Sequence, residues 1–81
     1  MEQRVALISI IVEDKGAVEE INKLLHEFGE FIIGRMGLPY VKKNVNIISI
    51  AMDGPMNSIS ALSGKLGALK GVSTKTIYAK L

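Results

Sequence analysis

In this 81-residue chain, the segment from Gly34 to Tyr40 contains the residues best suited to bind a ligand. Gly34 and Gly37 stand three residues apart inside an apolar run, which is typical of a β-bulge or of a close backbone approach to a ligand or another chain. Arg35 lies between them with Met36, and a guanidinium can grip a carboxylate or a phosphate with two parallel hydrogen bonds. Alternatively, the glycines only relieve packing under a helix and Arg35 is solvated. The sequence leaves both interpretations open.

A second polar segment, Glu13-Asp14-Lys15-Gly16, follows the first apolar run of the chain. Its composition predicts a turn that leads into a helix. Asp14 is a candidate N-cap, since its side chain can accept a hydrogen bond from a free backbone N–H of the first helical turn.

Residues suited to catalysis or metal binding are few. The chain has one histidine and no cysteine, so thiolate chemistry is absent and His26 lacks the companions that a metal site requires. Asp53 reads as a turn or cap residue. The segment around Ser63-Gly64-Lys65 lacks the order of a phosphate-binding loop and falls within a predicted helix. We therefore predict no enzyme, no metal site and no cofactor.

The hydrophobic pattern predicts the elements that position these segments. Apolar residues recur at helical spacing in two stretches and form β-branched runs in four others. The predicted strands cover residues 4–12, 31–38, 45–53 and 72–79, and the predicted helices cover 17–28 and 56–69. The loop 39–44 joins the second and third strands, Gly29 and Gly71 end the helices, and Pro55 opens the second helix. This order predicts one α+β domain over residues 1–81. It is the ferredoxin-like, split βαββαβ arrangement: a four-stranded antiparallel sheet with two helices on one face.

The first and third strands are apolar on both faces, although the helices of this fold cover only one. An 81-residue chain also has a thin core. The uncovered face predicts self-association into a homodimer or a tetramer through the sheet.

Charge and composition limit the other partners. The formal net charge is +2, with seven acids and three bases in residues 1–30 and one acid and seven bases in residues 31–81. This split suits self-association or an anionic partner, although it also fits two solvated faces of opposite sign.

The predicted central strands carry no aromatic residue for base stacking, so direct nucleic-acid binding is not expected. No apolar run reaches the length of a membrane span and the start is unlike a signal peptide, which predicts a cytoplasmic protein with no membrane partner.

The stretch Ile11 to Val18, followed by Ile21, Leu24, Leu25 and Gly29, resembles the opening of ACT domains. These βαββαβ modules dimerise and bind amino acids or other small effectors near the first strand–helix turn. The resemblance implies a site at the subunit interface for a small anionic or amino-acid-like ligand. Glu13, Asp14, Lys15 and Gly16 would line it together with Gly34, Arg35, Met36 and Gly37.

The segments Gly34 to Tyr40, Val45 to Ser49 and Ile59 to Gly67, with Gly71-Val72, resemble the family of iron-only hydrogenase system regulators over essentially the whole chain. Its members are similar to ACT domains and to the C-terminal domain of the nickel regulator NikR. One histidine and no cysteine do not supply that regulator's nickel site. The resemblance implies a regulatory module that senses a small ligand. The alternative is a protein–protein adaptor that docks on a maturation or transcription factor through the basic second half.

Overall fold

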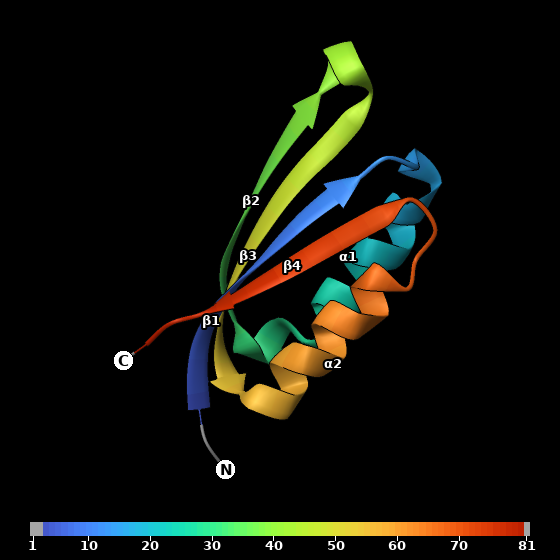
Figure 1. Cartoon of the computed structure of the whole chain (residues 1–81). Helices are drawn as coiled ribbons and strands as arrows, with labels where there is room; N and C mark the ends of the chain where they lie inside the picture. The colour runs from blue at the N-terminus through green and yellow to red at the C-terminus, as the bar shows by residue number, and fades with distance from the viewer. Residues whose placement is uncertain (1–2, 81) are drawn as a thin grey trace.

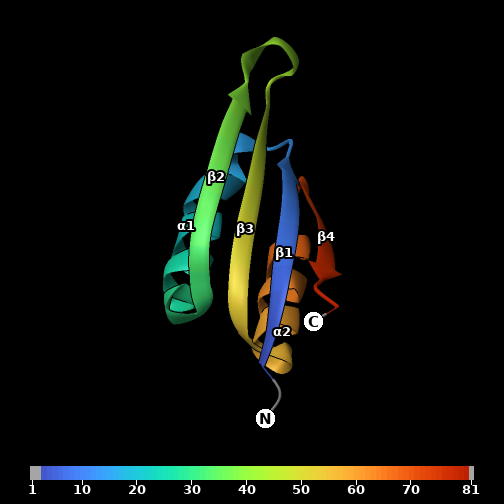
Figure 2. The same ribbon diagram turned by 90° about the vertical axis from the view of Figure 1, so that its left-hand side faces the viewer.

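The protein folds as a four-stranded antiparallel sheet with two helices on one face (Figure 1). This computed structural model describes residues 3–80. The elements are β1 (Gln3–Val12), α1 (Val18–Glu27), β2 (Ile32–Tyr40), β3 (Val45–Pro55), α2 (Met56–Gly67) and β4 (Val72–Tyr78). The strand order is β2-β3-β1-β4, and the turned view in Figure 2 shows both helices behind the sheet. The predicted fold class is confirmed.

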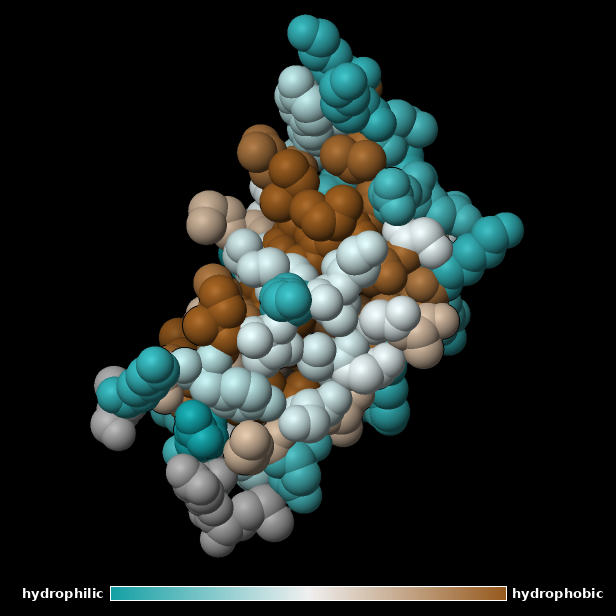
Figure 3. Space-filling model, in the orientation of Figure 1, coloured by the Kyte–Doolittle hydropathy of each residue, from teal (hydrophilic) through white to brown (hydrophobic). Residues whose placement is uncertain are grey.

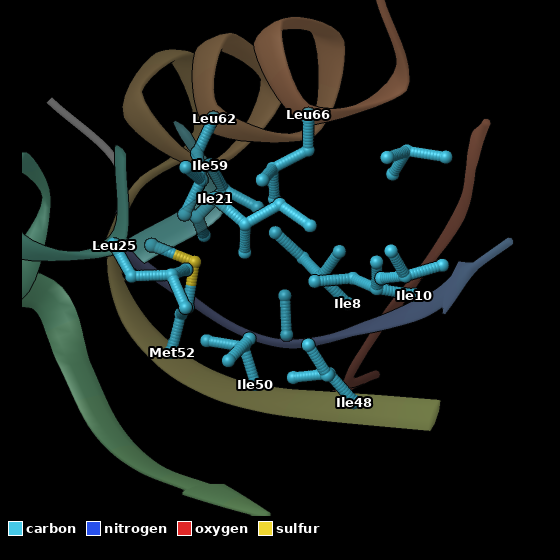
Figure 4. Packing of buried hydrophobic residues seen from close by; sticks show 13 residues of the cluster. Ile8, Ile10, Ile21, Leu25, Ile48, Ile50, Met52, Ile59, Leu62 and Leu66 are labelled. Carbon is cyan, nitrogen blue, oxygen red and sulfur yellow. The ribbon is translucent and has the colours of Figure 1, made fainter. Parts of the chain in front are cut away.

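The core lies between this sheet and its helices (Figure 4). Alternate residues of the two central strands point toward the helices and are buried, which follows from the two-residue period of a strand. They are Ala6, Ile8, Ile10 and Val12 of β1, and Ile48, Ile50 and Met52 of β3. The helices add Ile21 and Leu25 of α1, and Ile59, Leu62 and Leu66 of α2. Burying one such aliphatic side chain contributes about 1.5–3 kcal/mol.

The β2–β3 hairpin is longer than predicted. Pro39 and Tyr40, assigned to the loop, belong to β2 and pair with Asn46 and Val45. β2 is an edge strand, so the missing N–H of Pro39 can face away from the ladder. The remaining connection is a 3₁₀ turn, Val41–Lys43.

The end of β3 also differs from the prediction. The strand runs through Gly54 to Pro55, and Pro55 is the N-cap of α2 rather than its first helical residue. A Cβ on Gly54 would lie 2.8 Å from the Phe31 ring. The glycine is therefore needed here for close packing and does not break the strand.

Gly29 holds the C′ position of α1, directly after the C-cap Phe28, whereas Gly71 lies farther beyond the end of α2. α1 ends at Glu27, and Gly29 starts a 3₁₀ turn without a positive φ. α2 ends at Gly67, and Gly71 has φ +74°. Gly71 therefore provides the left-handed residue that leads into β4.

The small residues on one side of α2 let this helix approach β4. A Cβ on Gly67 would lie 3.0 Å from Thr74 Oγ1, and the Thr76 hydroxyl donates to Ser63 Oγ at 2.9 Å. The helix is therefore in close contact with β4 at Ser63 and Gly67, whereas a Cβ on Gly64 would meet nothing within 4 Å. Within residues 3–80, no helix has the length and apolar character to cross a membrane.

Candidate functional site

The Glu13–Gly16 turn is tied to the α2–β4 connection. The backbone N–H of Glu13 donates to the carbonyl of Gly71 at 2.7 Å. Asp14 Oδ1 accepts from the backbone N–H of Gly16 at 2.9 Å. Asp14 thus caps the 3₁₀ turn Lys15–Ala17, whereas the N-cap of α1 is Ala17, which makes no side-chain bond. Asp14 is therefore a capping residue, as predicted, but it caps the short 3₁₀ turn that precedes α1 and not α1 itself.

We expect Asp14→Ala to lower the free energy of unfolding by about 1 kcal/mol, since loss of a capping side chain typically has this effect. Asp14→Asn should keep most of the stability because its amide oxygen can still accept from Gly16. Chemical denaturation of both variants measures the difference. Equal losses in the two would show that the charge of Asp14, rather than the cap, stabilises the turn.

The strand register places the residues from Gly34 to Gly37 on both faces of β2. Arg35 and Gly37 pair with Ile50 and Ile48, whose side chains are buried on the helix side. Gly34 and Met36 therefore belong to the opposite face. The register shifts between Ile32 and Gly34, so the strand pairing is irregular at the start of this segment.

The packing interpretation of the two glycines is wrong within one chain. A Cβ built on Gly34 or on Gly37 meets nothing within 4 Å. Their small size therefore leaves open space beside β2.

Arg35 lies beside α1 on the helix side of the sheet. Its Nη2 donates to Asn22 Oδ1 at 3.3 Å, and both side chains are exposed. Two open hollows meet at this pair and together form the α1–β2 groove. The first, about 280 Å³, is lined by Val18, Asn22, Arg35, Gly37, Leu38, Pro39, Asn46 and Ile48. The second, about 400 Å³, is lined by Asn22, Leu25, His26, Gly29, Ile32 and Arg35.

The groove brings together only part of the predicted site. Arg35 and Gly37 line it, whereas Gly34 and Met36 belong to the opposite sheet face. None of the residues 13–16 lines either hollow. In a single chain, the turn and the 34–37 segment are therefore separate features, and their meeting at a subunit interface remains a prediction.

Sequence reasoning missed Asn22, His26 and Asn46. Asn22 and His26 follow Val18 at four-residue steps on α1, so helical spacing could have placed them on one side of the helix. Asn46 pairs with Pro39 across the hairpin, and that register was not predicted. Among the described residues, no three of His, Cys, Asp or Glu come together in an arrangement that could hold a metal ion.

The sheet face opposite the helices carries a second surface feature. Strand alternation puts seven large hydrophobic side chains there, each between 37 and 70% exposed. They are Leu7, Ile11, Met36, Leu38, Tyr40, Ile47 and Ile77. We call this surface the open sheet face. Figure 3 looks onto the β4 edge and shows brown, hydrophobic surface on the strand side, below the hydrophilic tip of the β2–β3 hairpin.

The fold and sequence were compared with known proteins. The structure of uncharacterized protein TM1266 from Thermotoga maritima superposes with a TM-score of 0.93 at 39% identity, covering 98% of this chain and 100% of that one. The ACT domain from GTP pyrophosphokinase of Chlorobium tepidum gives a TM-score of 0.77 at 20% identity, covering 94% and 100%. A homoserine dehydrogenase from Thiobacillus denitrificans gives 0.65 at 18% identity, covering 95% of this chain but 17% of that one. The similarity to the Chlorobium tepidum domain shows that the fold is ACT-like. No curated protein sequence matches.

A family model matches residues 4–76, which is nearly the whole chain. That extent, together with the similarity to the Thermotoga maritima protein, confirms the resemblance found in the sequence. The chain belongs to the TM1266-like family, which is described as "Iron-only hydrogenase system regulator, putative".

Proposed function

We propose that this protein is a homo-oligomeric regulatory module of an iron-only hydrogenase system that senses a small ligand at the subunit interface. The family description supports a regulatory role, and the fold is that of ACT domains. The observation that carries the proposal is the open sheet face.

Hydrophobic exposure of this kind favours self-association. Soluble monomers rarely present a large contiguous apolar patch. The seven side chains of the open sheet face come from all four strands, so they spread across the sheet. Burying even ~500 Å² of apolar surface per chain would contribute on the order of 12 kcal/mol before the costs of association. A second copy offers the same apolar face and would cover it by two-fold symmetry.

The α1–β2 groove supplies a site for the ligand. It contains Arg35 and lies along β2, an edge strand with eight of its nine residues exposed. Because the open sheet face lies on the other side of the sheet, a ligand held at a subunit interface requires a second contact at the β2 edge, as in a tetramer.

Native mass spectrometry of the gently purified protein tests assembly and ligand together. We expect a dimer or a tetramer that carries an additional small mass. A monomer at micromolar concentration would contradict self-association. A clean oligomer that carries no additional mass after purification in volatile buffer would contradict a tightly held ligand.

The β2–β3 hairpin favours a second candidate function, an adaptor that docks on an acidic protein surface. Its tip carries Val41, which is 82% exposed, beside Lys42 and Lys43. The hairpin extends beyond the helices in Figure 1. An apolar side chain flanked by two cations suits a partner with an apolar pocket and an acidic rim.

Pulldown from the native host would test this docking role. The double variant Lys42→Glu/Lys43→Glu should lose any partner that the wild-type protein captures. The control Lys70→Glu/Lys80→Glu changes the charge equally at two exposed lysines away from the hairpin, and should retain that partner. Capture that is the same with all three proteins would exclude the hairpin as the docking element.

A further inference from the structure

We propose that the α1–β2 groove selects a small organic anion, with a carboxylate or phosphate group on an apolar body, and discriminates against free amino acids. This inference rests on the proposed ligand-sensing function and specifies the class of ligand. The polar groups that line the two hollows account for this selection.

The polar lining of the groove is cationic or neutral throughout. Arg35 and His26 provide the titratable groups, and Asn22 and Asn46 provide two amides. Among residues 3–80, no aspartate or glutamate lines either hollow. An anionic oxygen would therefore find a guanidinium and amide N–H donors, whereas the ammonium of an amino acid would find no carboxylate partner.

Arg35 is placed where an anion could recruit it. Within residues 3–80, the Arg35 side chain makes one hydrogen bond, in which its Nη2 donates to the neutral Asn22 Oδ1 at 3.3 Å. A hydrogen bond to a charged acceptor is shorter and about twice as strong as one to a neutral acceptor. An incoming carboxylate or phosphate can thus replace the amide oxygen and release Asn22 to donate its own N–H groups to the same anion.

The remaining walls suit an apolar body. Pro39 and Ile48 line the first hollow, and Leu25 and Ile32 line the second. The second hollow, of about 400 Å³, falls within the size range of small-molecule sites, and the first, of about 280 Å³, lies just below that range. Because both hollows meet at Arg35, the charged group would sit at the junction with the body in one of them.

A third hollow, of about 560 Å³, shows that the charge selection is local. It is lined by Glu19, Asn22, Lys23, His26 and Glu27, all on α1. Its two carboxylates and one ammonium give it mixed charge. It lacks Arg35 and every residue of the sheet, so it offers neither the guanidinium nor the apolar wall of β2 and β3.

Matched probes test the selection on the assembled protein. We would titrate 3-phenylpropanoate, phenylalanine and 3-phenylpropanamide into ¹⁵N-labelled protein and follow backbone amides by NMR, with inorganic phosphate as a separate arm. The carboxylate should shift amides around Asn22, Arg35 and Asn46. It should bind at least about tenfold more tightly than the amino acid or the neutral amide, because a hydrogen bond to a charged acceptor is about twice as strong as one to a neutral acceptor. Shifts with phosphate alone would assign a phosphate group, and shifts with the carboxylate alone would assign a carboxylate.

Two variants check the role of Arg35. Arg35→Gln should weaken binding of the favoured probe at least about tenfold while leaving assembly unchanged, and Lys70→Gln, an exposed charge outside the groove, should leave binding intact. Phenylalanine binding as tightly as 3-phenylpropanoate would overturn the proposed selection, as expected if Glu13 of a second copy reaches the groove. An oligomer whose groove amides respond to none of the probes would overturn the groove as an anion site and leave self-association standing. A monomer that still binds the carboxylate would contradict the proposed oligomeric sensor but not the groove.

Discussion

Gly71→Ala should destabilise the protein by about 2–4 kcal/mol and lower its Tm by roughly 10–25 °C. Two effects add. Gly71 has φ +74°, a conformation that is unfavourable for any residue with a Cβ. That Cβ would also lie 2.5 Å from Asp14 Cβ and 3.0 Å from the Asp14 backbone nitrogen. Because Gly71 accepts the hydrogen bond from Glu13, the collision would also disturb the turn that leads into α1.

Two further variants separate these effects. Asparagine tolerates the positive φ better than alanine, but its Cβ makes the same collision. Gly71→Asn should therefore lower the free energy of unfolding by less than Gly71→Ala does. Gly64→Ala is the matched control, since Gly64 lies inside α2 and a Cβ there meets nothing within 4 Å. It should stabilise the protein by about 0.5–1 kcal/mol, because alanine is the better helix former. Thermal and chemical denaturation give these values, and a neutral Gly71→Ala would contradict the close approach to Asp14.

Most of the fold could be predicted from hydrophobic periodicity. β1 and β3 are β-branched runs whose buried residues alternate, and α1 repeats its apolar residues at helical spacing. Glycine and proline gave less reliable boundaries, because their role depends on neighbours that are distant in sequence. Gly54 stays in β3 because the Phe31 ring lies over it, and Pro39 stays in β2 because the strand is at an edge.

The site was predictable only in part. Glycine is unfavourable inside a strand, so the sequence indicated that Gly34 and Gly37 have a special role beside Arg35. The structure shows open space at both glycines. The partners of Arg35 depend on how α1 lies over the sheet. Asn22 is thirteen residues from Arg35 in sequence, and a helical-spacing pattern alone cannot indicate which strand it faces.

Ile47→Lys should dissociate the oligomer while leaving the fold of each chain intact. Ile47 lies on the open sheet face between Ile11 of β1 and Leu38 of β2, and it is 37% exposed in the single chain. In the monomer, the lysine side chain can extend into water. In a face-to-face assembly, each copy would bury an unpaired ammonium among apolar side chains, which is strongly unfavourable. We expect the Kd for assembly to rise at least about a hundredfold, as measured by analytical ultracentrifugation.

The control is Val41→Lys, which makes the same type of substitution at the 82% exposed hairpin tip. It should leave assembly unchanged if the open sheet face is the interface, and circular dichroism should show native secondary structure for both variants. An oligomer that survives Ile47→Lys but not Val41→Lys would place the interface at the hairpin. If both variants still assemble, the contact must lie elsewhere, and the edge of β2 beside the α1–β2 groove would become the surface to test. In that case, ligand binding at Arg35 and assembly would depend on the same strand, and the favoured probe of the groove should change the Kd for assembly.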